Sequence, residues 1–136
     1  MIVSPWIRSN VVDRTFTTEL EKALERKVEV YILYGIKQRP KQGQQNDITA
    51  IRALKDLAYK YKNLYFEQVK NTHRKIIVSD DSFGVVTSFN FLSFRADPNL
   101  TYRDELGVVL RDKKTISDLF ESGLNLPRAE VLLTPQ

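Results

Sequence analysis

Four polar residues stand at spacings that could support catalysis. His73 and Lys75 lie two positions apart at the start of one apolar segment, and Ser88 and Asn90 lie two positions apart at the end of the next. Side chains alternate between the two faces of a β-strand, so each pair lies on one face of its strand. The two strands are therefore expected to present two polar pairs.

A tight turn between these strands would bring the two pairs together. A two-residue turn at positions 81 and 82 places His73 opposite Asn90. The same register places Lys75 opposite Ser88, with directly opposed Cβ atoms about 5 Å apart. We therefore expect an imidazole, an ammonium, a hydroxyl and an amide on one face of the sheet.

This set of groups suits a phosphate. An ammonium neutralises the charge of the phosphoryl oxygens, and hydroxyl and amide groups donate hydrogen bonds to them. Histidine can act as a nucleophile or proton carrier near neutral pH. The alternative is a polar sheet face without chemistry, but Ile76, Ile77 and Val78 direct the first strand into the core. Polar groups gathered at the start of a buried strand favour a functional role.

The same residues carry a resemblance to a known family. The spacing His73-x-Lys75-x4-Asp80 resembles the H-x-K-x4-D motif of the phospholipase D superfamily. Its members continue with Gly-Ser-x-Asn on the next strand, where this chain has Thr87-Ser88-Phe89-Asn90 and so replaces the glycine. Glu105 matches an acidic residue that the family places at the start of a further strand. The resemblance covers nearly the whole chain.

The resemblance implies a phosphodiesterase that needs no metal and no cofactor. In this family one histidine attacks phosphorus and forms a covalent phosphohistidine, which would be the role of His73. A histidine from a second copy of the motif protonates the leaving oxygen, and water then reverses the two roles. This division supplies an acid and a base in turn.

The resemblance also assigns roles to the other motif residues. Lys75, Ser88 and Asn90 would bind the phosphoryl oxygens and stabilise their charge. Glu105 would accept a hydrogen bond from the second ring nitrogen of the histidine and fix its tautomer. Asp80, at the end of the strand, is expected to shape the turn rather than touch phosphate.

A complete site of this family needs two histidines, and the chain has one histidine and one motif. A two-fold homodimer whose motifs meet at the axis would supply the second copy. The short single-motif endonucleases of the superfamily are homodimers, which favours this solution. The other solution is that residues 1–136 are one phospholipase D-like domain of a longer protein, as a start inside a strand also indicates.

Composition bears on the substrate. The chain has 136 residues, a net charge of +4, a pI near 9.3 and no cysteine, which excludes thiolate metal sites and, with a single histidine, sites built on several histidines. The basic balance favours DNA or RNA, with Arg74 as a further cation. Phe94 and Tyr102 are candidates for stacking on bases.

Two other functions remain open at this stage. A lipid phosphodiesterase or phosphatidyl transferase would need an exposed apolar patch, for which the aromatic residues near Asn90 are the candidates. A nucleic-acid-binding or dimerisation module of a larger DNA-processing or defence protein would show salt-sensitive binding without turnover. The chain has no apolar segment near the roughly 18 residues of a membrane span and no signal-peptide pattern, so a cytoplasmic location is expected.

The fold is expected to be α/β, with a mixed central sheet flanked by helices. Thr18 and Glu21 resemble a helix-capping pair, and Gly123 is expected to end the last helix. Helices are predicted over Thr15–Arg26, Asp47–Tyr61 and Thr115–Ser122, and strands over Ile2–Ile7, Val28–Tyr34, Leu64–Val69, His73–Ser79, Gly84–Asn90 and Glu105–Arg111.

Overall fold

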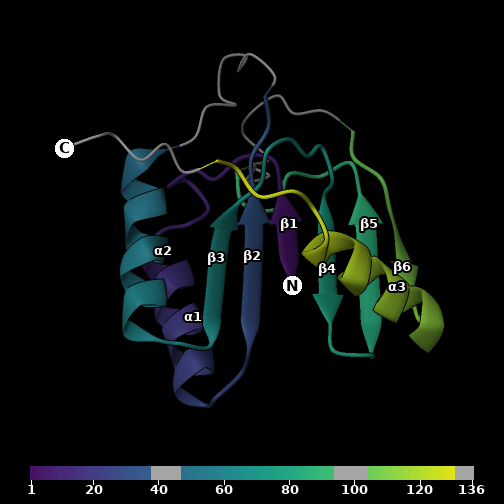
Figure 1. Ribbon diagram of the computed structural model, residues 1–136, viewed down its shortest axis with the longest axis horizontal. Coiled ribbons are helices and arrows are strands. Elements are labelled where there is room, and N and C mark those ends of the chain that lie inside the picture. Colours follow the sequence, from purple (N-terminus) through teal and green to yellow (C-terminus); the bar gives the residue numbers. More distant parts are fainter. Residues whose placement is uncertain (38–46, 94–103, 131–136) are drawn as a thin grey trace.

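The protein forms one six-stranded sheet with helices on both faces (Figure 1). The structure is a computed structural model that describes residues 1–37, 47–93 and 104–130. The expectation of an α/β fold with a mixed central sheet is confirmed. Its elements are β1 (Ile2–Ser4), α1 (Arg14–Glu25), β2 (Val30–Tyr34), α2 (Ile48–Lys60), β3 (Leu64–Gln68), β4 (Ile76–Ser79), β5 (Phe83–Thr87), β6 (Gly107–Leu110) and α3 (Lys113–Leu124).

The sheet has a parallel half and an antiparallel half. Its strand order is β3-β2-β1-β4-β5-β6. β1, β2 and β3 pair in parallel and are joined through α1 and α2, whereas β4, β5 and β6 continue the sheet in antiparallel pairing. Parallel strands need crossover connections, which explains why both long crossovers lie in the first half of the chain.

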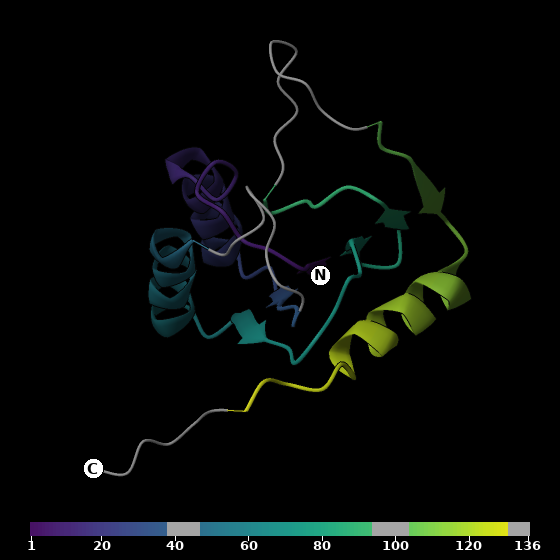
Figure 2. The ribbon, with the colours of Figure 1, turned by 90° about the horizontal axis from the view of Figure 1, so that it is seen from above.

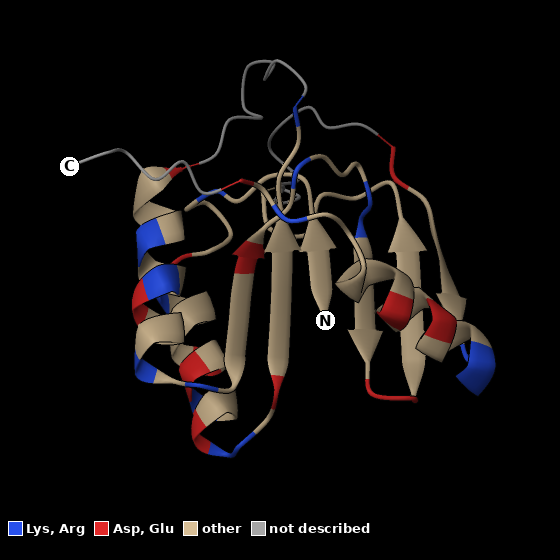
Figure 3. Cartoon of the chain, viewed as in Figure 1, with Lys and Arg blue, Asp and Glu red and all other residues tan. Residues whose placement is uncertain are grey.

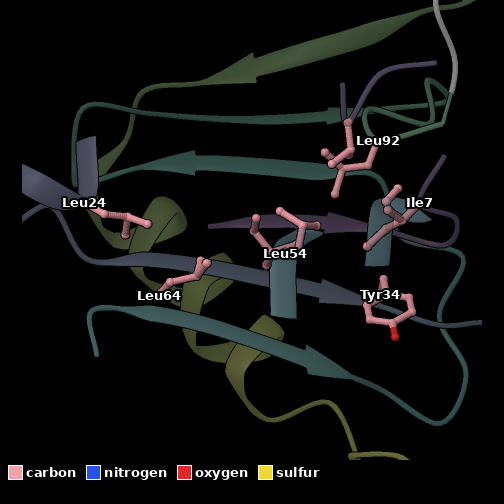
Figure 4. Close-up of a cluster of buried hydrophobic side chains, with 9 residues drawn as sticks. Ile7, Leu24, Tyr34, Leu54, Leu64 and Leu92 are labelled. Carbon is pink, nitrogen blue, oxygen red and sulfur yellow. The ribbon is translucent and has the colours of Figure 1, made fainter. Parts of the chain in front are cut away.

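Each face of the sheet carries its own hydrophobic core. Under α1 and α2, Leu24, Leu54 and Leu64 pack with residues of the central strands, as Figure 4 shows. Under α3, Ile116 packs with Val78 and with other residues of the sheet. Seen from above in Figure 2, α1 and α2 cover the half of the sheet around β3 and β2, and α3 lies on the opposite face beside β4 and β5.

Aspartates begin all three helices of the described residues. The side chains of Asp13, Asp47 and Asp112 accept hydrogen bonds from backbone N–H groups in the first turns of α1, α2 and α3. The expected capping pair at Thr18 is therefore wrong, because α1 starts a full turn earlier and Thr18 lies within it. Asp13 already satisfies the N–H of Phe16, at 2.9 Å.

Gly123 has a packing role instead of ending its helix. α3 continues to Leu124 and is capped by Asn125. A Cβ atom on Gly123 would lie 2.6 Å from the sulfur of Met1, which is closer than such atoms approach. The glycine therefore lets α3 pack directly against the start of β1.

The turn between β4 and β5 is one residue longer than expected. Ser79 pairs with Phe83, so residues 80–82 form the loop, and Asp80 adopts a left-handed conformation with φ of 49°. Asp tolerates this conformation better than most residues. The register is shifted by one, which places Lys75 opposite Thr87 rather than Ser88: the Thr87 N–H donates to the Lys75 carbonyl at 3.1 Å.

Candidate active site

The motif residues lie just outside the regular strands, at one end of the antiparallel half of the sheet. β4 begins at Ile76, β5 ends at Thr87 and β6 begins at Gly107, so all three strands are shorter than predicted. Strict alternation would send Ser88 and Asn90 to the face opposite Lys75 in the observed register. Because these residues follow the end of β5, their side chains need not alternate between the two faces of the sheet.

The structure nevertheless brings five of the expected residues to one surface hollow of about 490 Å³. Two further residues, which sequence reasoning did not select, complete its lining. The hollow is lined by His73, Lys75, Thr87, Ser88, Asn90, Asp104 and Glu105.

Lys75 is the buried cation of this hollow. Its side chain is only 6% exposed, and its ammonium donates a hydrogen bond to the His73 carbonyl at 2.9 Å. The same nitrogen lies 3.3 and 3.2 Å from Nδ1 and Nε2 of the His73 ring. Burial lowers the pKa of Lys75, and the carboxylate of Glu105 opposes that shift. Burial has removed water from around this ammonium, and a bound anion would offset the free-energy cost of that desolvation.

His73 is exposed at the mouth of the hollow. Its pKa is lowered from the ordinary value near 6.5, first by partial burial and second by the positive charge of Lys75. Both causes disfavour the imidazolium. A neutral imidazole at neutral pH has a free lone pair, which is the form that a nucleophile requires.

Glu105 contacts Ser88 rather than the histidine. The Ser88 hydroxyl donates a short hydrogen bond to the Glu105 carboxylate, and the Leu106 N–H donates to the Ser88 oxygen at 3.2 Å. Among the described hydrogen bonds none joins Glu105 to His73, which differs from the expected role. The reason is register: Ser88 continues the β5–β6 pairing opposite Leu106, and this places its hydroxyl beside the neighbouring Glu105.

Asn90 carries an unsatisfied polar atom. Its Oδ1 is buried and has no hydrogen-bond partner, although the residue lines the hollow. A buried amide without a partner costs free energy, on the order of 1–3 kcal/mol. Rotation of the amide by 180° exchanges its oxygen and nitrogen, so either an acceptor or a donor can occupy this position. A ligand oxygen would satisfy the donor.

Two expected site residues lie elsewhere. The Arg74 guanidinium donates a hydrogen bond to the Ser122 hydroxyl of α3 at 2.6 Å, and Asp80 lies in the turn at the other end of β4. Neither lines the hollow. The contact with α3 directs the Arg74 side chain away from the hollow. Phe94 and Tyr102 lie outside the described residues.

Thr87, which replaces the glycine of the family pattern, is accommodated by a second glycine. Thr87 pairs with Gly107 on β6, and its hydroxyl donates to the Leu106 carbonyl at 3.0 Å. A Cβ atom on Gly107 would lie 2.7 Å from the Cβ of Thr87. The threonine side chain therefore occupies space that its partner leaves empty. Residues 87 and 107 are 20 positions apart in sequence, so their contact can be recognised only from the strand register.

Comparison with known proteins matches this architecture. Residues 2–123 match the family described as "Cardiolipin synthase, PLD-like domain". The chain belongs to this phospholipase D-like family. The crystal structure of Nuc from Salmonella typhimurium, a phospholipase D family member, superposes with a TM-score of 0.60 over 96% of this chain and 80% of that chain, at 17% identity. A comparison with curated proteins gave no match.

Two further properties bear on the site. In the part of the chain that the structure describes, no three His, Asp or Glu side chains are grouped so that they could hold a metal ion. None of the described helices is long and apolar enough to cross a membrane. The hollow itself presents one imidazole, one buried ammonium, two hydroxyls, an amide and two carboxylates.

Proposed function

We propose that this protein is a metal-independent phosphodiesterase that cleaves DNA or RNA through a phosphohistidine on His73, in a site shared by two chains. The observation that carries the proposal is the buried ammonium of Lys75 beside the exposed His73 ring, in one hollow with Asn90. A neutral imidazole can attack the phosphorus of an anionic phosphodiester, and a desolvated ammonium beside it can stabilise the negative charge.

The proposed reaction has two steps, as the resemblance to the phospholipase D superfamily implies. One ring nitrogen of His73 attacks phosphorus, a P–N bond forms, and the P–O bond to the leaving oxygen breaks. The second chain's His73, which enters this step as the imidazolium, donates a proton to that oxygen and becomes neutral. Water then attacks phosphorus, gives its proton to the second imidazole and breaks the P–N bond. Lys75 and the Asn90 amide hold the non-bridging oxygens, where negative charge develops.

Charge supports nucleic acid as the substrate. The chain has a net charge of +4, and a polyanion is attracted to a basic protein over distances comparable to the Debye length. The exposed apolar residues Val108 and Val109 of β6 support the phospholipid alternative. A binding module without turnover is the third possibility to test.

The proposal is tested with four substrates in excess EDTA: single-stranded DNA, duplex DNA, RNA and bis(p-nitrophenyl) phosphate. Vesicles that contain phosphatidylglycerol serve as a fifth. We expect chelator-resistant cleavage of a nucleic acid and of the aryl diester, and none by the His73→Ala variant. Cleavage of the lipid alone would select the phospholipase alternative. Salt-sensitive DNA binding without any turnover would select the binding module. Activity that Mg²⁺ or Mn²⁺ must restore would overturn the mechanism.

A further inference from the structure

Two buried side-chain atoms of the described residues have no hydrogen-bond partner. One is Oδ1 of Asn90, in the hollow, and the other is Nη1 of Arg8, in the loop between β1 and α1. An unpaired buried polar group costs free energy, and the cost is larger when the group is charged. No ion pair among the described residues includes Arg8. The described part of the chain therefore leaves this positive charge without a compensating anion.

Backbone contacts place Arg8 beside the segment that leads away from the hollow. The Arg8 N–H donates a hydrogen bond to the Leu92 carbonyl at 2.9 Å. Two positions further along the same loop, the side-chain amide of Asn10 donates to the Ser93 carbonyl at 3.1 Å. The Ser93 N–H in turn donates to the Asn90 carbonyl, also at 3.1 Å. The loop that carries Arg8 is thus bonded to the turn that begins at Asn90.

The same turn is bonded to the strand end that neighbours Lys75. β1 and β4 pair in antiparallel fashion, and one step beyond their last pair Ser4 lies across from Lys75. The Ser4 hydroxyl oxygen accepts a hydrogen bond from the Leu92 N–H at 3.4 Å. Leu92 therefore joins the Arg8 backbone to the end of β1 that lies beside the buried ammonium. Arg8 approaches the hollow from the side of β1.

We propose that Arg8 binds the phosphate that neighbours the scissile phosphate in a nucleic-acid strand. The inference rests on the proposed function, which places the scissile phosphate in the hollow with Lys75 and Asn90. Arg8 does not line that hollow, so its guanidinium is offered to a second anion rather than to the reacting one. A guanidinium can donate two parallel N–H bonds to one phosphate. Such a contact would satisfy the unpaired Nη1 and compensate its charge.

The distribution of charge favours a ligand with more than one phosphate. The six described strands contain one charged residue, Glu67, so the other charges lie on helices and connecting segments. In Figure 3 several cationic segments, drawn in blue, lie in the loops at the upper end of the sheet, where β1 and β5 end and β4 begins. A nucleic-acid strand offers a phosphate at every nucleotide and can contact successive cations. Phosphatidylglycerol offers a single phosphate.

Binding to a chain that cannot react tests this assignment. In a His73→Ala background, NMR titration gives the affinity for a thymidine trinucleotide, which has two phosphodiesters, and for the dinucleotide, which has one. We expect this chain to prefer the trinucleotide. Arg8→Met should reduce that preference about 10-fold or more, because it removes a charge-assisted contact that only the longer ligand makes. An equal loss of affinity for both ligands would place Arg8 at the reacting phosphate and overturn the proposal.

Two further variants control for charge and for folding. Arg14 is exposed in the first turn of α1, so Arg14→Met removes the same charge nearby and should change the preference less than threefold. Arg8→Lys keeps the charge but loses the planar fork, and we expect a smaller loss than in Arg8→Met. It covers the case in which Arg8→Met fails to fold, which circular dichroism reports. A preference as high in Arg8→Lys as in Arg14→Met would count against the guanidinium contact.

The remaining outcomes separate this inference from the proposed function. Turnover of the aryl diester by the wild type, with the same preference in Arg8→Met as in Arg14→Met, would refute the Arg8 contact and leave the phosphodiesterase intact. A trinucleotide preference that Arg8→Met abolishes, without turnover of any substrate by the wild type, would support the Arg8 contact and refute the enzyme. Equal affinity of the His73→Ala chain for the two ligands would overturn the proposal.

Discussion

The short distance between the Lys75 ammonium and the His73 ring favours the neutral form of the histidine. An ammonium within 3.3 Å of an imidazole cannot easily tolerate a second positive charge on that ring. Both the burial and the charge lower the pKa of His73, so the neutral ring persists to lower pH than in an isolated histidine. In the proposed mechanism the buried lysine would therefore have two functions: it would bind phosphate, and it would keep the neighbouring histidine neutral and nucleophilic.

The single histidine makes this effect directly measurable. We expect an NMR titration of His73 in the wild type to give a pKa below the ordinary value near 6.5. Lys75→Met should raise that pKa, because it removes the neighbouring charge. Arg74→Met is the matched control: its guanidinium is directed to Ser122, so the pKa of His73 should not move. A pKa that is the same in wild type and Lys75→Met would contradict the electrostatic account.

Substitutions of residues in the hollow should lower the turnover rate far more than substitutions of residues outside it. We expect Lys75→Ala and Asn90→Ala each to lower kcat on the order of 10²–10³-fold, the loss seen when one preorganised donor to a developing oxyanion is removed. Arg74→Ala, which does not touch the hollow, should change kcat for the aryl diester less than threefold. Steady-state kinetics on purified, folded variants measure this, and equal losses for all three would place the site elsewhere.

At the scale of elements, the site depends on how β5 and β6 are joined. The pairing of Thr87 with Gly107 holds the β5–β6 ladder together at the edge of the hollow. The Ser88–Glu105 hydrogen bond extends that ladder beyond the last strand residues. These contacts position the segment that carries Asn90, so a change in the ladder should affect chemistry as well as stability.

A double-mutant cycle tests this packing. Gly107→Ala places a Cβ atom 2.7 Å from that of Thr87, and we expect destabilisation of about 1–3 kcal/mol from overpacking. Thr87→Gly opens the space again, so the double variant Thr87→Gly/Gly107→Ala should be more stable than the sum of the single effects predicts. Urea unfolding gives the three values. Strict additivity would show that the two positions do not share one space.

Much of this arrangement is predictable from sequence, and the limits have physical causes. The alternation of strands and helices follows from the periodicity of the sequence. The gathering of His73, Lys75, Ser88 and Asn90 is also predicted, but from a register that the structure does not have; it arises because Ser88 and Asn90 lie beyond the end of β5. The register of the hairpin does not follow from periodicity, because it depends on whether Asp80 enters a left-handed conformation. The contact of Glu105 with Ser88 depends on the register between β5 and β6, which the sequence does not reveal. The contact between Thr87 and Gly107 likewise forms only across these paired strands.

At the scale of the whole molecule, the proposed mechanism requires two chains that form one site. Each chain contributes a single histidine, and phosphohistidine chemistry with an acid on the leaving oxygen uses two. Activity should therefore fall with dilution below the dissociation constant of the dimer, and the aryl diester assay across protein concentrations measures this.

Mixing active and inactive chains tests the central claim most directly. Wild type is refolded together with increasing amounts of His73→Ala, and turnover per wild-type chain is measured in EDTA. A mixed dimer keeps one histidine, so the activity per wild-type chain should fall in proportion to the wild-type fraction and approach zero at large excess. Activity per wild-type chain that stays constant at every ratio of His73→Ala would contradict the shared site.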